Sequence, residues 1–106
     1  MTDLHLVPPP DPEQQAESML KRAEAILNFL NLKAQRRFPA RTPKGQPTSA
    51  LLLIVDRLRD GWPDADFRSV IAMKARNVRT DKDAFYLRPE TLFRKSNFEM
   101  SIGELE

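Results

Sequence analysis

Apolar residues recur at helical spacing between residues 16 and 30, and this pattern predicts a first helix that runs to about residue 32. The apolar set is Ala16, Met19, Leu20, Ala23, Ile26, Leu27 and Leu30. Asp11 and Pro12 stand just before it, and these residue types are preferred at the N-cap and at the first helical position. Residues 1–10 end in three prolines and are expected to form a disordered arm outside the fold.

The next apolar run, residues 51–58, is apolar on almost every side, which indicates a helix buried at the centre of the fold. Thr48 and Ser49 can cap this helix, and Gly61 can end it. A buried strand is the alternative for the start of this run. The charged residues that continue from Asp56 favour the helix.

A third helix is predicted to begin around Trp62 or Asp64, and capping is the interpretation we give to Asp64. Its inner stripe consists of Phe67, Val70, Ile71, Ala75 and Val78. Lys74 lies inside this stripe, where it either extends its ammonium group to solvent or pairs with a carboxylate from another element. Residues 80–83 are expected to form a loop, in which Asp81 and Asp83 favour a turn.

The segment that follows, residues 85–93, is the most informative part of the chain. Pro89 suits the first position of a short helix, and Arg88 before it is biased towards an extended conformation. Phe85 and Phe93 are expected to be buried at the two ends of this helical turn. Arg88 is expected to bond carbonyls or a carboxylate within the fold.

Together these elements predict an all-α fold, a small bundle of three main helices plus a short C-terminal helical turn. A length of 106 residues suits one domain. We divide the chain into the arm at residues 1–10, a helical domain at residues 11–100 and a frayed tail at residues 101–106. Residues 36–47 are rich in proline and basic residues and are expected to form a loop, with Phe38 inserted into the core.

Charge is distributed unevenly although the net charge is only +2. Residues 31–48 contain five basic residues and no acidic one, and residues 73–80 contain three basic residues and no acidic one. Such basic strips can bind a polyanion, although solvated surface charge is the ordinary alternative. The residues predicted to contact nucleic acid or another partner are Arg36, Arg37, Arg41, Lys44, Arg68, Arg76, Arg79 and Trp62. For Trp62 the alternative role is to cover the core.

The sequence offers little for catalysis. Its single histidine, His5, lies in the predicted arm, whereas acid–base and metal roles need a fixed geometry. The chain has no cysteine, and the glycine near Lys44 does not have the spacing of a phosphate-binding loop. We therefore expect no enzyme activity, no cofactor and no metal. No apolar run is long enough to span a bilayer and no signal peptide is visible, so a cytoplasmic location is expected.

Several blocks of the chain resemble the conserved C-terminal domain of phage replication proteins, of the replisome-organiser or replication-initiation type. The blocks are residues 26–31, Phe38, Ile54, Arg57, Leu58, Gly61, Trp62, Asp66, Phe67, Val70, Ile71 and Lys74, then Tyr86, Leu87, Arg88, Pro89, Glu90, Thr91, Leu92, Phe93, Asn97, Phe98 and Glu99. The last of these blocks is the most specific. The sequence differs from the family at residues 76–79, because family members usually have a tryptophan in this stretch and this chain has none there.

The resemblance implies a helical module of phage replication that contacts DNA with low specificity, the replicative helicase or its loader, in the cytoplasm of the bacterial host. Tyr86, Leu87, Arg88, Pro89, Thr91, Leu92 and Phe93 are then structural residues of the family motif. Family members usually carry a separate N-terminal domain that recognises DNA, so origin-specific binding is not expected here. The alternatives are an effector that binds and inhibits a host protein, and a fragment of a larger gene product. The last of the blocks above, from Tyr86 to Glu99, can also form the interface of a homodimer. Binding to a membrane is not expected.

Overall fold

The computed structural model describes residues 12–105 and confirms the all-α fold class. The arm predicted at residues 1–10 and the predicted cap Asp11 lie outside the described residues. Within them the helices are α1 (Pro12–Ala34), α2 (Ser49–Arg59), α3 (Asp64–Arg76), α4 (Asp81–Phe85), α5 (Pro89–Leu92) and α6 (Lys95–Glu104). The alternative of a strand at residues 51–55 is therefore wrong.

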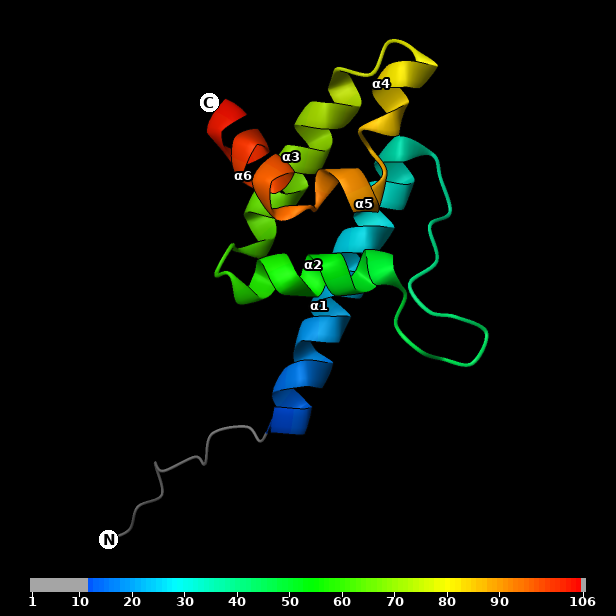
Figure 1. Cartoon of the computed structure of the whole chain (residues 1–106), viewed down its shortest axis with the longest axis vertical. Helices are drawn as coiled ribbons and strands as arrows, with labels where there is room; N and C mark the ends of the chain where they lie inside the picture. Colours follow the sequence, from blue (N-terminus) through cyan, green and yellow to red (C-terminus); the bar gives the residue numbers. More distant parts are fainter. Residues whose placement is uncertain (1–11, 106) are drawn as a thin grey trace, which may run out of the picture.

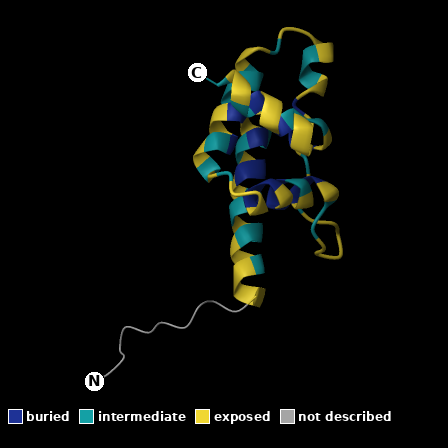
Figure 2. Ribbon diagram, turned by 60° about the vertical axis from the view of Figure 1, so that its left-hand side comes forward, coloured by how far each residue is buried: buried dark blue, intermediate teal, exposed yellow. Residues whose placement is uncertain are grey.

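The helices form two groups around α1 (Figure 1). The central helix α2 crosses α1, and α3 packs on α1 as well. The short helix α5 lies against α2, and α6 lies against α3. The first turns of α1 extend away from this body and are exposed, whereas one side of its second half is buried (Figure 2).

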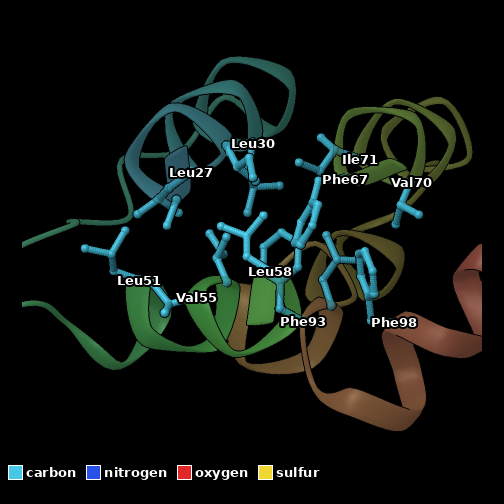
Figure 3. Packing of buried hydrophobic residues seen from close by; sticks show 14 of the residues in the cluster. Leu27, Leu30, Leu51, Val55, Leu58, Phe67, Val70, Ile71, Phe93 and Phe98 are labelled. Atoms are coloured by element: carbon cyan, nitrogen blue, oxygen red, sulfur yellow. The ribbon is translucent and has the colours of Figure 1, made fainter. Parts of the chain in front are cut away.

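The core is formed where α1, α2, α3 and the C-terminal helices meet (Figure 3). Phe67, Phe93 and Phe98 are fully buried, and the ring centroids of Phe67 and Phe98 lie 4.8 Å apart. Leu, Ile and Val side chains from α1 and α2 complete the cluster: Ile26, Leu27, Leu30, Leu51, Ile54, Val55 and Leu58. Because aromatic pairs at this spacing stabilise each other beyond the area that they bury, the three phenylalanines join α3 firmly to the C-terminal helices.

Helix α2 begins and ends as its sequence predicts. The Thr48 side chain accepts a hydrogen bond from the Leu51 N–H at 3.3 Å, as an N-cap residue does. Asp60 caps the C-terminus, and Gly61 follows with φ of +105°, a conformation that favours glycine. These two signals fix the length of the central helix.

A buried arginine connects α2 to residues 85–93, which we call the closing segment. Arg57 Nη1 donates to the Phe93 carbonyl at 3.0 Å, and its Nε donates to Asp60 at 2.7 Å. Phe93 is the C-cap residue of α5, so its carbonyl has no partner within that helix. Arg57 therefore provides the hydrogen-bond donor for the free carbonyl at the end of α5, and the aliphatic part of its side chain packs within the core.

Asp64 does not have the capping role that the sequence suggested. Pro63 is the N-cap of α3, and the Asp64 carboxylate accepts hydrogen bonds from Arg22 on α1, one of them at 2.9 Å. These hydrogen bonds lower the pKa of Asp64 and raise that of Arg22. The pair joins the start of α3 to α1 across 42 positions of sequence.

The C-terminal half contains more helix than predicted. Residues 81–85 form α4 and not a loop, because Thr80 accepts from the Asp83 N–H and Asp83 accepts from the Arg79 N–H, which caps the start of the helix. The predicted frayed tail at residues 101–106 is also wrong as far as Glu104, since these residues complete α6. The Ser101 side chain is buried and donates to the Asn97 carbonyl.

Lys74 takes the second of its two predicted roles. Its ammonium group pairs with Glu104 of α6 at 2.9 Å. A carboxylate from another element thus compensates a lysine placed beside the apolar stripe of α3.

Candidate nucleic-acid interface

Two of the predicted contact residues, Arg36 and Arg79, come together with the motif residue Arg88 at one end of the molecule. Arg36 follows α1, Arg79 lies between α3 and α4, and Arg88 precedes α5. Two adjoining hollows lie between these segments and share Arg36 and Asp81 in their walls. We call the first of them the arginine–aromatic hollow; it is lined by Arg36, Phe38, Asp81, Ala84, Phe85, Arg88 and Glu90. Its segments lie side by side where the end of α1 meets α4 (Figure 1).

The wall that carries Arg36 and Phe38 is held by Asn31 of α1. The Asn31 amide donates to the Phe38 carbonyl at 3.0 Å and accepts from the Phe38 N–H at 2.9 Å. Helix α1 ends with Gln35 at φ of +56°, and the Arg36 N–H bonds the Asn31 carbonyl. Asn31 therefore fixes the direction of the chain as it leaves the helix, and with it the position of Arg36. Phe38 is half-buried against the core, as predicted.

The opposite wall carries the exposed ring of Phe85, and Tyr86 beside it in sequence is exposed as well. Phe85 is 49% exposed and Tyr86 is 52% exposed, and their rings meet edge to face with centroids 5.9 Å apart. The prediction that Phe85 is a buried end of the closing segment is wrong. Helix α4 is too short to turn Phe85 inwards and buries none of its own residues. Phe93, at the other end, is fully buried as predicted.

Arg88 also differs from its predicted role. Its guanidinium carbon lies 4.8 Å from the centroid of the Phe85 ring, a cation–π contact at the surface. The side chain is exposed, and among the described residues the guanidinium has no hydrogen-bond acceptor. The expected bond to an internal carbonyl or carboxylate is therefore absent, and its N–H donors are available to an external anion.

The remaining motif residues divide between core and surface. Leu87, Pro89, Leu92 and Phe93 are buried, which confirms them as structural. The Thr91 carbonyl accepts from the Asn97 amide at 2.8 Å, which joins α5 to α6. Tyr86, however, belongs to the exposed surface and not to the core.

Arg41, a member of the predicted binding set, has partners within the fold. Its Nε donates to Glu24 on α1 at 3.0 Å, and its Nη1 donates to the Gly45 carbonyl at 3.0 Å. Arg41 thus holds the loop between α1 and α2 against α1. Gly45 turns this loop with φ of +84°.

The other predicted contacts are dispersed. Arg37, Lys44, Arg68 and Arg76 are exposed, but none of them lines the arginine–aromatic hollow. Arg37 lies between two residues that do, and the other three lie on different segments. Arg76 borders a separate groove between α3 and α6, and Arg79 lies beyond the end of α3. Trp62 is half-buried and contacts Phe98 edge to face at 5.9 Å, so it covers the core.

Sequence reasoning missed Phe85 as a surface residue, and it missed Asn31 and Arg57 as positioning residues. The only available signal for Phe85 was its place just after two aspartates and a lysine, in a segment with no helical apolar stripe. Asn31 and Arg57 gave a weaker signal, a polar residue within an apolar stretch. Their partners lie 7 and 36 positions away, so no local pattern reveals them.

The described residues contain no cluster of three or more histidine, cysteine, aspartate or glutamate side chains able to hold a metal ion. None of the described helices has both the length and the apolar character that crossing a membrane requires.

Comparison with known proteins identifies one family. The model of a family described as a conserved phage C-terminus matches residues 26–101. No curated protein and no solved structure matches the chain. The matched range runs from the second half of α1 to α6 and includes the arginine–aromatic hollow and the closing segment. Because the match covers well over half of the sequence, the chain belongs to the conserved phage C-terminus family.

Proposed function

We propose that this chain is a non-enzymatic accessory module of phage DNA replication that binds DNA through the end of the molecule formed by Arg36, Arg79 and Arg88. The observation that carries the proposal is the convergence of these three exposed arginines, from three separate segments, around two adjoining hollows that share Arg36. Phosphate contacts of this kind give affinity that does not depend on sequence. The expected site of action is the cytoplasm of the bacterial host.

A second surface supports contact with a protein, such as the replicative helicase or its loader. A groove between the closing segment and α6 is lined by Tyr86, Leu92, Met100 and the Lys74–Glu104 pair, among other residues. Met100 is 70% exposed there, and flexible methionine side chains suit surfaces that adapt to a partner. The same groove favours the alternative function, an effector that binds and inhibits a host protein.

The DNA-binding part of the proposal is tested by salt dependence. We expect the full chain to bind a labelled oligonucleotide at low salt, with affinity that falls steeply as salt rises. The double variant R36Q/R79Q removes two charges at the hollow, and the slope of log K against log salt should decrease by about 1.5. The matched control, K21Q/R59Q, removes two exposed charges on α1 and α2 and should lower the affinity far less.

Absence of binding at low salt would refute the DNA-binding part. The protein-binding part is tested by a pull-down from bacterial lysate with the wild type and with M100E, which places a charge in the groove beside α6. Stoichiometric recovery of a helicase or loader that is lost with M100E supports the accessory role. Recovery of a different host protein in the same way supports the effector.

A further inference from the structure

We infer that the arginine–aromatic hollow binds single-stranded DNA in preference to duplex, with an unpaired base stacked on Phe85. This inference rests on the proposed DNA-binding function and specifies the form of DNA that the same surface selects.

Phe85 and Tyr86 expose their aromatic rings at this end of the molecule. The other phenylalanines of the described residues are buried or half-buried, whereas Phe85 and its neighbour Tyr86 are about half exposed. The edge-to-face contact of Tyr86 supports Phe85 from the side and restricts its rotation. Bases in a duplex are stacked on one another and cannot reach such a ring, but an unpaired base can stack on it.

Arg88 supplies the matching phosphate contact. Its guanidinium group already lies over the Phe85 ring, so part of the cost of ordering this long side chain is met before DNA binds. A base on Phe85 and a phosphate on Arg88 are neighbouring groups of one nucleotide. Arg36 stands across the hollow, where it can take the phosphate of the next nucleotide along the strand.

Acidic residues line the hollow together with the arginines. Asp81 and Glu90 stand among the arginines, with Asp81 between the two adjoining hollows. A duplex presents an unbroken row of phosphates to a protein surface, and these carboxylates would repel it. On a single strand the amino groups of cytosine, adenine and guanine are free to donate, and a carboxylate is a suitable acceptor for them. A surface that combines positive charge, an aromatic ring and carboxylates therefore fits a strand that carries both phosphates and unpaired bases.

The test compares the full chain with its F85A variant by fluorescence anisotropy, using a labelled single-stranded oligonucleotide and the same sequence as duplex. We expect the wild type to bind the single strand more tightly than the duplex at the same salt concentration. F85A should weaken single-strand binding by about 5-fold to 100-fold, the range measured for loss of one stacked base, and should leave duplex binding nearly unchanged. The matched control is L52A, which removes a side chain of similar exposure on α2 and should bind like the wild type.

A second variant separates stacking from apolar contact and from folding. F85L keeps an apolar side chain of similar size, and it should lose single-strand affinity almost as F85A does while melting at the wild-type temperature. Ultraviolet cross-linking to the single strand, followed by mass spectrometry of the peptides, should place the attached base on Phe85 or Tyr86. A single strand of RNA in place of DNA tests whether the sugar matters to this surface.

The outcomes distinguish this inference from the function on which it rests. If R36Q/R79Q weakens binding but F85A and F85L do not, or if duplex binds as tightly as the single strand, stacking is refuted and the DNA-binding function remains. If neither form of DNA binds at low salt, both are refuted.

Discussion

At the scale of single residues, the Arg22–Asp64 pair shows how one contact across the fold replaces a local role. An aspartate at the first turn of a helix is ordinarily assigned to capping. Here the carboxylate turns to a guanidinium on α1, and its pKa is lowered by the hydrogen bonds that it accepts there. The pair is partly exposed, so its contribution to stability is modest.

Asp64→Asn should lower the free energy of unfolding by up to about 1 kcal/mol at neutral pH. Because the pKa of Asp64 is lower in the folded protein than in the unfolded chain, this contribution is present above the ordinary aspartate pKa and is lost as the pH falls through the folded pKa. Denaturant titrations at neutral and strongly acidic pH should therefore show a difference between wild type and variant only at neutral pH.

The control for this prediction is Asp56→Asn, because Asp56 is an exposed carboxylate on α2. A difference between Asp64→Asn and wild type that persists unchanged at strongly acidic pH would contradict the proposed origin of the effect.

At the scale of elements, a single buried side-chain hydrogen bond joins α2 to the end of α5, in addition to their apolar packing. Arg57→Met keeps an apolar stem of similar length but removes the hydrogen bond to the Phe93 carbonyl. We expect it to lower the free energy of unfolding by about 1–3 kcal/mol, because a buried carbonyl is left without a partner. Thermal or denaturant unfolding measures this change.

Arg59→Met is the matched control, since Arg59 is exposed and lies two residues further along the same helix. It should change the free energy of unfolding by no more than about 0.5 kcal/mol. Equal effects of the two substitutions would show that the bond to Phe93 contributes nothing specific.

The elements differ in how far the sequence could predict them. The helices α1 and α3 have a clear apolar period and α2 has a continuous apolar run, and all three appear close to their predicted positions. Helix α4 buries none of its residues, and α6 has Phe98 and Ser101 as its buried residues, so neither presents a continuous apolar stripe to recognise. Their positions follow from capping by Thr80 and from the packing of Phe98 on Phe67, and the second of these is a contact between distant parts of the chain.

At the scale of the whole molecule, the candidate site lies on its least buried helix. The described part of the chain has its core among α1, α2, α3, α5 and α6, whereas α4 is attached mainly through its two ends. Local stability follows the number of buried apolar contacts, so α4 should open more often than the rest.

Hydrogen exchange measured by mass spectrometry tests this difference. Amides of residues 81–86 should exchange much faster than those in the centres of α2 and α3, and a bound single-stranded oligonucleotide should slow them. Protection of this segment equal to that of α2 without DNA would contradict the expected local opening.

The candidate site itself could be predicted only in part. The basic residues were visible in the sequence, but which of them share a surface depends on the end of α1, the end of α3 and the start of α5 meeting in space. Arg41 and Arg79 are two examples. Arg41 donates a hydrogen bond to Glu24, and Arg79 lies in the connection after α3, because that helix ends at Arg76. No local pattern contains that information.

The exposed first turns of α1 have a practical consequence. A helix of 23 residues is about 34 Å long, so its beginning is remote from the arginine–aromatic hollow near its other end (Figure 1). A dye, a biotin or a solid support attached at residues 12–15 should leave DNA access undisturbed. This end of the helix is therefore a suitable attachment site for single-molecule measurements of the proposed DNA binding.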